Sequence, residues 1–310
     1  MFTRITTALI TTLACMTGVN QTAQAAGYTQ TKYPVVLTHG MFGWNKMVGG
    51  IDYFYQVPST LQSGGAKVYS TEVSGLASSE QRGEQLLSQV KTILAVSGSP
   101  KVNLFGHSHG GHSIRYVAAM IPGQIASVTA IGTPAKGSPV ADLVISIDTA
   151  SPALGSIAYT MLNGLDSLIN LLSNDKNKVI DARQSMYALS SKGSAEFNAK
   201  FPQAVPTTAC GQGASSVNGV RYYSWGGTGV VTTGIDPSDA LMGTLSLAFL
   251  GGANDGLVGK CSSHIGQVLR DDYNMNHLDE VNQMLGVRAL FTNPLEIYRQ
   301  HANRLQLGGM

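Results

Sequence analysis

Short apolar runs alternate with amphipathic stretches along the first half of the chain. A short, continuous apolar run over 33–40 ends in a turn signal and predicts a strand. A β-rich run over 66–73 and two further segments, 101–105 and 125–132, predict three more strands. Apolar side chains recur at helical spacing over 78–98 and 112–121, and Ser78 with Gln81 fits the pattern of a capping box. Because strands that alternate with helices form parallel sheets, we expect an α/β fold with a mostly parallel sheet and helices on both faces.

The second half begins with a stretch whose apolar positions gather on one side of a helix. They fall at 154, 157, 161, 165, 168, 169 and 172, and Asp166 is the only charge on the other side. This face predicts either a core helix or a mobile lid over an apolar pocket. Strand character returns at 220–225. We therefore expect a single domain over 27–310, with a helical cap or lid insertion at about 139–205.

The N-terminus has the features of a targeting segment. Arg4 precedes a moderately apolar stretch over 5–18, and Ala23, Gln24 and Ala25 fit a small-residue cleavage site. We expect a signal peptide at 1–26 and a secreted mature protein. A lipidated Cys15 is the alternative, which Thr12 fits poorly.

The charge composition of the chain narrows the classes of function that it could have. The formal net charge is +2 and only 12% of the residues are charged, which gives no electrostatic reason to propose a nucleic-acid partner.

Removal of the signal peptide would also remove Cys15, so two cysteines would remain in the mature protein. In an oxidising compartment Cys210 and Cys261 most simply form one disulfide.

The stretch "GHSHG" places Ser108 between two glycines, after an apolar strand and before an amphipathic helix. This context predicts a sharp turn that presents the serine hydroxyl at the carboxyl edge of the sheet. Gly106 and Gly110 lack a Cβ, so strand and helix can approach closely. We take Ser108 as a candidate nucleophile.

A serine nucleophile needs a base and an orienting acid, which follow it in the order acid and then histidine on this type of fold. Asp255 in "NDGLV" lies in a glycine-flanked turn and suits the acid. His112 is too close to Ser108 to reach back, and His301 lies in a polar tail. His277, in a loop directly before a helix, and His264, beside Cys261, remain; we favour His277.

The transition state also needs two backbone N–H donors for the developing oxyanion. One should come from His109, the residue after the serine, and the other from Met41 in the loop "THGMFG" after the early strand. We expect His39 in the same loop to be a structural histidine with its hydrogen bonds satisfied.

At this point the chain resembles the secreted, foldase-dependent Pseudomonas-type bacterial triacylglycerol lipases. The matching segments include "YTQTKYPVVLTHGM", "PKVNLFGHSHGG", "ANDGLVG" and "MNHLDEVNQ", and they run over nearly the whole mature chain. The resemblance implies an α/β-hydrolase fold and hydrolysis of long-chain acylglycerol esters through an acyl-enzyme. It implies Ser108, Asp255 and His277 as the catalytic triad, with Met41 and His109 as oxyanion donors. Cys210 and Cys261 match the disulfide pair of the family.

The resemblance further implies a structural calcium ion and several partners. The matching calcium positions are Asp236 and Asp279 by carboxylate, and Gln283 and Val287 by main-chain oxygen. The implied partners are a lipid–water interface and a periplasmic lipase-specific foldase, followed by export to the medium. The family more often has proline where this chain has His112, for which we expect a structural or surface role.

Two other functions remain compatible with the sequence. A soluble short-chain carboxylesterase would use the same triad, and an apolar lid face over 154–172 argues for a lipase instead. A catalytically inactive hydrolase fold that serves for binding would not need the serine, aspartate and histidine positions, which are all present.

Overall fold

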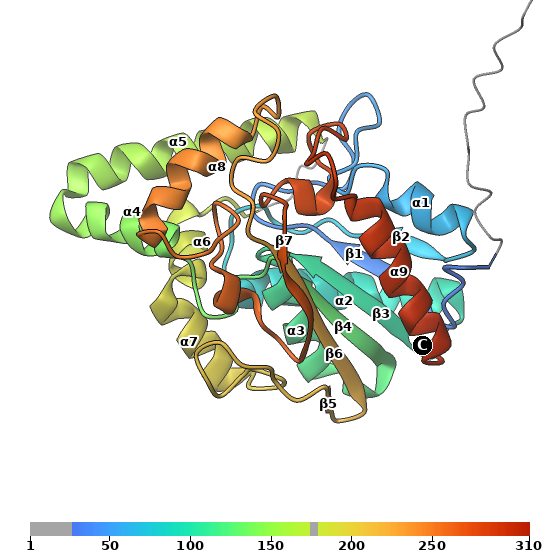
Figure 1. Ribbon diagram of the computed structural model, residues 1–310. Coiled ribbons are helices and arrows are strands. Elements are labelled where there is room, and N and C mark those ends of the chain that lie inside the picture. Colours follow the sequence, from blue (N-terminus) through green and yellow to red (C-terminus); the bar gives the residue numbers. More distant parts are fainter. Residues whose placement is uncertain (1–26, 174–178) are drawn as a thin grey trace, which may run out of the picture.

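A twisted central sheet forms the body of the protein (Figure 1). The computed structural model describes residues 27–173 and 179–310, so the expected signal peptide at 1–26 lies outside the described residues. The strands are β1 (Val35–Thr38), β2 (Val68–Ser70), β3 (Val102–His107), β4 (Ile125–Ile131), β5 (Ser216–Val217), β6 (Val220–Gly227) and β7 (Gln267–Tyr273). Their order is β2-β1-β3-β4-β6, with β7 parallel and the short β5 antiparallel against β6. The predicted α/β class with a mostly parallel sheet is confirmed.

Helices cover both faces of the sheet. On one face, α2 (Ser79–Ser97) and α3 (Gly110–Met120) bury their apolar sides against β3 and β4. On the other face lie α1 (Val57–Ser63) and α9 (Pro294–Leu307). The described residues also include the 3-10 helices η1 (Pro122–Gln124), η2 (Ser246–Phe249), η3 (Lys260–Ser263) and η4 (Asp279–Val281).

Local signals explain where α2 begins and ends. The Ser78 hydroxyl accepts from the Gln81 backbone N–H, and the Gln81 side chain accepts from the Ser78 N–H, so the predicted capping box is present. Gly98 ends the helix in the left-handed conformation, which a glycine adopts without steric cost. Leu86 and Val90 then face the core with no exposed surface.

Helices inserted between β4 and β5 form a cap above the carboxyl edge of the sheet. They are α4 (Pro139–Ala150), α5 (Pro152–Leu172), α6 (Ala182–Leu189) and α7 (Ser191–Lys200). A separate small core holds α4, α5 and α6 together through Ala141, Tyr159, Met186 and Leu189, with Leu76 from the body. Helix α8 (Asp239–Leu245) leads into the segment that follows it, which contacts α4 of the cap.

The apolar side of α5 points away from the body. Its side chains are 41–70% exposed at Leu154, Ile157, Met161, Leu165, Leu168 and Leu172. The side that packs inward mixes polar and apolar residues: Asp166 is fully buried, Tyr159 and Ile169 are almost fully buried, and the Asn163 side chain accepts from the Ala182 N–H at 2.9 Å. The interpretation of this segment as an ordinary core helix is therefore wrong.

The C-terminal segment is also more ordered than its polar sequence suggested. In α9, Tyr298 and Leu305 are fully buried, and His301 Nε2 lies 2.7 Å from the Thr129 hydroxyl. The expectation of a polar tail around His301 is wrong because every third or fourth residue of the segment packs on the sheet.

A disulfide joins Cys210 to Cys261, as predicted, across 51 positions of the chain. It ties the segment after the cap to η3, just before β7. Among the described residues, no helix has both the length and the apolar character that a bilayer crossing requires.

Candidate active site

Ser108 occupies the turn between β3 and α3 in a strained backbone conformation. Its φ is +55°, in the left-handed region that residues with a side chain rarely adopt. Its N–H donates to the Ile131 carbonyl at 2.8 Å, which fixes the turn on β4. A Cβ at Gly106 would lie 2.4 Å from the Gly110 carbonyl oxygen, and one at Gly110 would lie 2.4 Å from the Thr38 oxygen. Only glycine fits at either position, which explains the spacing of the motif.

Asp255 and His277 are paired at the same edge of the sheet. Asp255 Oδ2 lies 2.7 Å from His277 Nδ1, and both residues are almost fully buried. The other carboxylate oxygen accepts the N–H groups of Leu257 and Val258 at 2.8 and 2.7 Å. The His277 N–H also donates to the Asp255 carbonyl at 2.9 Å, so the two loops are joined by backbone as well as side chain. This arrangement fixes the imidazole with Nε2 as its free nitrogen for chemistry.

His264, the other histidine that the sequence left open, is engaged elsewhere. Its Nδ1 lies 2.9 Å from the Gly211 carbonyl oxygen and its Nε2 lies 3.0 Å from Asp271 Oδ2. Both ring nitrogens thus hold the disulfide region against β7. The structure brings Asp255 to His277 and not to His264.

The loop after β1 passes close to the serine. A Cβ at Gly40 would lie 2.7 Å from Ser108 Cβ, so the backbone leading to Met41 is in contact with the turn. The buried Arg82 holds this loop by donating to the carbonyls of His39 and Gly40 at 2.6 and 3.2 Å. Within the described part of the chain, neither the Met41 nor the His109 N–H donates to a protein group.

His39 and His112 have structural environments. His39 Nε2 accepts the Val73 N–H at 3.2 Å, as expected of a satisfied histidine. His112 is fully buried, lies 3.0 Å from the Ser79 hydroxyl and stacks on Phe197. Burial lowers the pKa of His112 to about 3, so it is neutral at physiological pH. The structural role expected for His112 fits, and a surface role does not.

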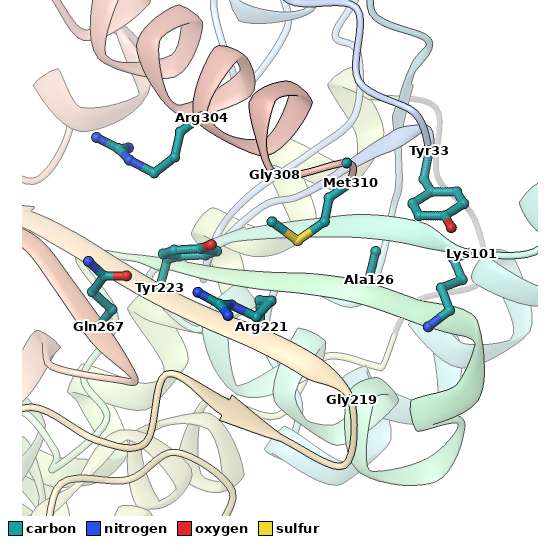
Figure 2. A pocket seen from close by; sticks show the side chains of 11 residues that line it. Tyr33, Lys101, Ala126, Gly219, Arg221, Tyr223, Gln267, Arg304, Gly308 and Met310 are labelled. Carbon is teal, nitrogen blue, oxygen red and sulfur yellow. The ribbon is translucent and has the colours of Figure 1, made fainter.

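A narrow apolar pocket of about 40 Å³ opens beside Ser108. Its walls come from the loop after β1, from α4 and α6 of the cap, and from the turn after Asp255. They include Met41, Val140, Ala141, Met186, Leu189, Leu257 and Val258. A larger pocket of about 520 Å³ lies at the opposite edge of the sheet, among Tyr33, Lys101, Arg221 and Met310 (Figure 2). We place the site at the small pocket because it alone of the two contains Ser108.

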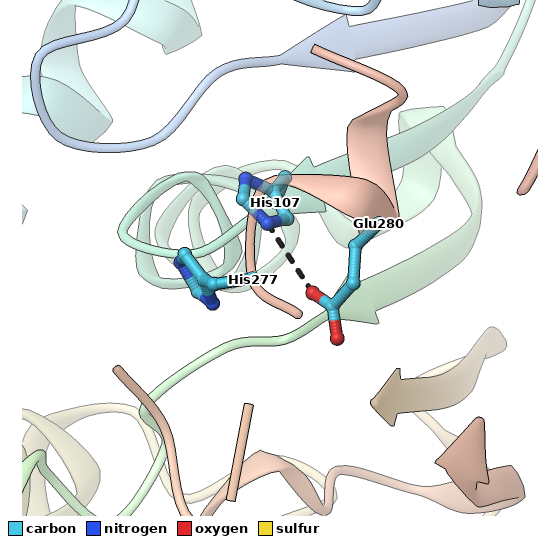
Figure 3. A group of neighbouring side chains, drawn as sticks. All are labelled: His107, His277 and Glu280. Carbon is cyan, nitrogen blue, oxygen red and sulfur yellow. Dashed lines mark ion pairs between the residues drawn. The ribbon is translucent and has the colours of Figure 1, made fainter. Parts of the chain in front are cut away.

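A second group of polar side chains, not anticipated from the sequence, lies behind the Asp255–His277 pair. Figure 3 shows His107, Glu280 and His277 facing one another. The His107 and His277 rings are 4.5 Å apart between centroids, and His107 Nδ1 lies 2.7 Å from the Tyr53 hydroxyl. Burial lowers the pKa of His107 well below its usual value, and burial together with the charge of Asp255 raises the pKa of Glu280.

The two carboxylates suggested for calcium lie close together and are buried. Asp236 Oδ2 and Asp279 Oδ1 have no hydrogen-bond partner among the described residues. Burial, with a contribution from the charge of Asp236, raises the pKa of Asp279 to about 7. Gln283 lies one turn further on and donates its N–H to Leu278. Two orphaned carboxylate oxygens suit a hard cation such as calcium, which prefers oxygen ligands.

The cluster of His107, His277 and Glu280 could also hold a metal ion, because its ligand atoms lie within 4.8 Å of one another. Two imidazoles suit zinc or other transition metals rather than calcium. Any calcium would therefore belong to Asp236 and Asp279.

A serine in a strained strand-to-helix turn, an aspartate–histidine pair and a parallel sheet together define a serine hydrolase of the α/β-hydrolase class. The profile of the alpha/beta hydrolase fold matches residues 33–281, and the chain belongs to this family. Its similarity to bacterial triacylglycerol lipases confirms the resemblance drawn from the motifs.

Three relatives and one solved structure illustrate that similarity. The triacylglycerol lipase of Vibrio cholerae is 53% identical, covering 92% of this chain and 91% of the relative. The triacylglycerol lipase of Burkholderia plantarii is 40% identical, covering 91% of this chain and 88% of the relative. That of Pseudomonas fragi is 35% identical, covering 90% of this chain and 98% of the relative. The Staphylococcus hyicus lipase structure superposes with a TM-score of 0.61 at 18% identity, covering 90% of this chain and 98% of that one, which supports the fold alone.

Proposed function

We propose that this protein is a secreted triacylglycerol lipase that hydrolyses ester bonds of long-chain acylglycerols. Ser108 is the nucleophile, His277 the general base and acid, and Asp255 the residue that orients His277. The observation that carries the proposal is the position of Ser108, in a strained turn that opens on an apolar pocket. The wall of this pocket includes Leu257 and Val258, whose N–H groups hold the carboxylate of Asp255 that pairs with His277.

The reaction proceeds through an acyl-enzyme. His277 Nε2 takes the Ser108 proton as Oγ bonds to the ester carbonyl carbon, and the oxyanion receives N–H bonds from Met41 and His109. The intermediate collapses, the carbon–oxygen bond to the glycerol breaks, and His277 protonates the leaving alcohol. Water then attacks the acyl carbon with the same base, which releases the fatty acid and restores Ser108.

The distribution of apolar surface favours a lipase over a soluble esterase. The exposed side of α5 carries no charge, and η2, which contacts α4, adds further uncharged apolar surface with Leu247 at 74% exposure. Beyond it, Leu250 at the end of η2 is 95% exposed. An oil–water interface is a partner that would cover such a surface. In this arrangement α5 acts as a lid whose apolar face is turned toward lipid.

Calcium, secretion and a foldase complete the proposal. Asp236 and Asp279 would hold the ion by carboxylate, with Gln283 and Val287 adding main-chain oxygens. When bound, the ion would neutralise the two buried carboxylates and fix the loop that carries His277. Removal of the signal peptide at 1–26, folding assisted by a lipase-specific foldase in the periplasm and release to the medium follow from the family resemblance.

The test is fatty-acid release from an emulsified long-chain triglyceride, titrated at constant pH. Mature protein and a Ser108→Ala variant with the same circular dichroism spectrum are compared. Release that depends on Ser108 supports the lipase. Cleavage of a soluble butyrate ester without release from the emulsion would demote the protein to an esterase, and absence of both would indicate a binding protein.

A further inference from the structure

Three buried polar side chains link the segments that carry the proposed active-site residues. Tyr53, His107 and Glu280 are 4%, 0% and 0% exposed. None is a member of the triad. His107 directly precedes Ser108, and Glu280 follows His277 by three positions.

Tyr53 connects the oxyanion loop to the nucleophile turn. A Cβ at Gly40 would lie 2.8 Å from the Tyr53 hydroxyl, so this hydroxyl packs directly on the backbone that leads to Met41. The same hydroxyl lies 2.7 Å from His107 Nδ1. Its position therefore sets the distance between the loop that supplies one oxyanion donor and the turn that supplies the serine.

Glu280 connects the nucleophile turn to the loop of His277. Its Oε2 lies 3.3 Å from His107 Nε2, and its Oε1 accepts the Gly227 N–H at the end of β6 at 2.6 Å (Figure 3). A Cβ at Gly132 would lie 1.9 Å from Oε2, so glycine is required there to admit the carboxyl group. The φ of Gly132 is +47°, which also favours glycine.

Burying such groups costs free energy unless they are paired. An apolar core would fill the same space without that cost. The three side chains instead form one chain of contacts from Gly40 to Gly227 that passes His277 within ring contact. We propose that Tyr53, His107 and Glu280 form a positioning relay that holds the oxyanion loop, the nucleophile turn and the His277 loop in register.

The inference rests on the proposed hydrolase function, since it assigns these residues to the alignment of that site. The relay touches no reacting atom and transfers no proton in the reaction. Its members are positioning residues, and their loss should change the rate of the chemical step and not the binding of the ester.

The test uses Tyr53→Phe, which removes the hydroxyl that contacts His107, and Glu280→Gln, which replaces one carboxylate oxygen by an amide group; both change the side-chain volume little. We expect kcat on a soluble butyrate ester to fall about tenfold to a hundredfold at unchanged KM, the size that misplacing a catalytic group produces. The rate of Ser108 labelling by an organophosphonate should fall in parallel. The double variant should lose less than the product of the single losses, because both act through His107.

Tyr222→Phe provides the matched control. It removes the hydroxyl of another buried tyrosine in the core on the other face of the sheet, beside α3. It should leave kcat unchanged at a comparable melting temperature. Unchanged kcat in both relay variants, or losses equal to their loss of folded protein, would overturn the relay alone. Absence of Ser108-dependent hydrolysis in the unmodified protein would overturn the proposed function and the relay with it.

Discussion

Asp166, the only charged residue of α5, is buried against the backbone of Gly75. A Cβ at Gly75 would lie 2.0 Å from Asp166 Oδ1. Helix α5 is thus docked on the body in part through Asp166, and the absence of a side chain at position 75 makes this contact possible. Burial lowers the pKa of Arg82, which holds the loop after β1, to about 10, and the charges of Tyr53 and Asp166 partly offset this lowering.

We expect Gly75→Ala to displace α5 from this position. A methyl group there cannot coexist with the carboxylate, so the helix must shift or Asp166 must leave. Hydrolysis of an emulsion should fall more than hydrolysis of a soluble ester, and limited proteolysis should cut the cap faster. Gly164→Ala is the matched control, because nothing lies within 4 Å of a Cβ at that position of α5. It should stabilise the helix by about 1 kcal/mol. Equal behaviour of the two variants would contradict this account.

The exposed side of α5 should bind lipid. Met161 is 70% exposed, so Met161→Ser costs little packing in water. Burial of a methionine side chain in an apolar phase is worth about 1.5–3 kcal/mol, so adsorption to a triglyceride emulsion should weaken about tenfold or more. Activity on a soluble ester should not change. Leu307→Ser, at the end of α9 and 81% exposed, should leave both activities as they are. Similar adsorption of the two variants would remove α5 from the lipid-binding face.

The Asp255–His277 pair predicts a large and specific effect of one substitution. Asp255→Asn keeps the shape but removes the charge that stabilises the imidazolium, and the analogous change in serine proteases lowers kcat by about four orders of magnitude. His264→Ala, by contrast, should lower the melting temperature and keep most of the activity, since both of its ring nitrogens have structural partners. Steady-state kinetics on a soluble ester measures both. Comparable loss of kcat in the two variants would mean that the base is misassigned.

Much of the fold could be predicted because its signals are local. The capping box at Ser78, the glycines around Ser108 and the apolar runs each report on a few neighbouring residues, and the observed elements lie where they indicate. The side of α5 that packs inward could not be predicted. Its apolar periodicity marks a face, but whether protein or lipid covers that face depends on partners that periodicity does not encode.

The contact between His107 and Glu280 could not be predicted from the sequence either. His107 and Glu280 both lie in recognisable motifs, "GHSHG" and "MNHLDEV". Their meeting depends on the approach of β3, β6 and the His277 loop, and on the missing Cβ of Gly132. A single amino-acid sequence contains no signal that two residues 173 positions apart are in contact.

Calcium binding should depend on pH in a direction set by Asp279. Its pKa is raised from 3.8 to about 7 in the folded, metal-free protein, by burial first and then by Asp236. A raised carboxyl pKa contributes stability that is fully present below pH 3.8 and is lost as pH rises through about 7. Calcium binds the ionised form and offsets that loss. The gain in melting temperature on adding calcium should therefore be larger at pH 8 than at pH 5.

Differential scanning calorimetry with calcium or a chelator at the two pH values measures this gain. Asp279→Asn removes the titrating group and one ligand, so it should abolish both the calcium effect and its pH dependence. Asp272→Asn, an exposed aspartate on β7 that pairs with Arg270, is the matched control and should preserve them. A calcium effect of the same size at pH 5 and pH 8, or one that survives in Asp279→Asn, would place the ion elsewhere in the protein.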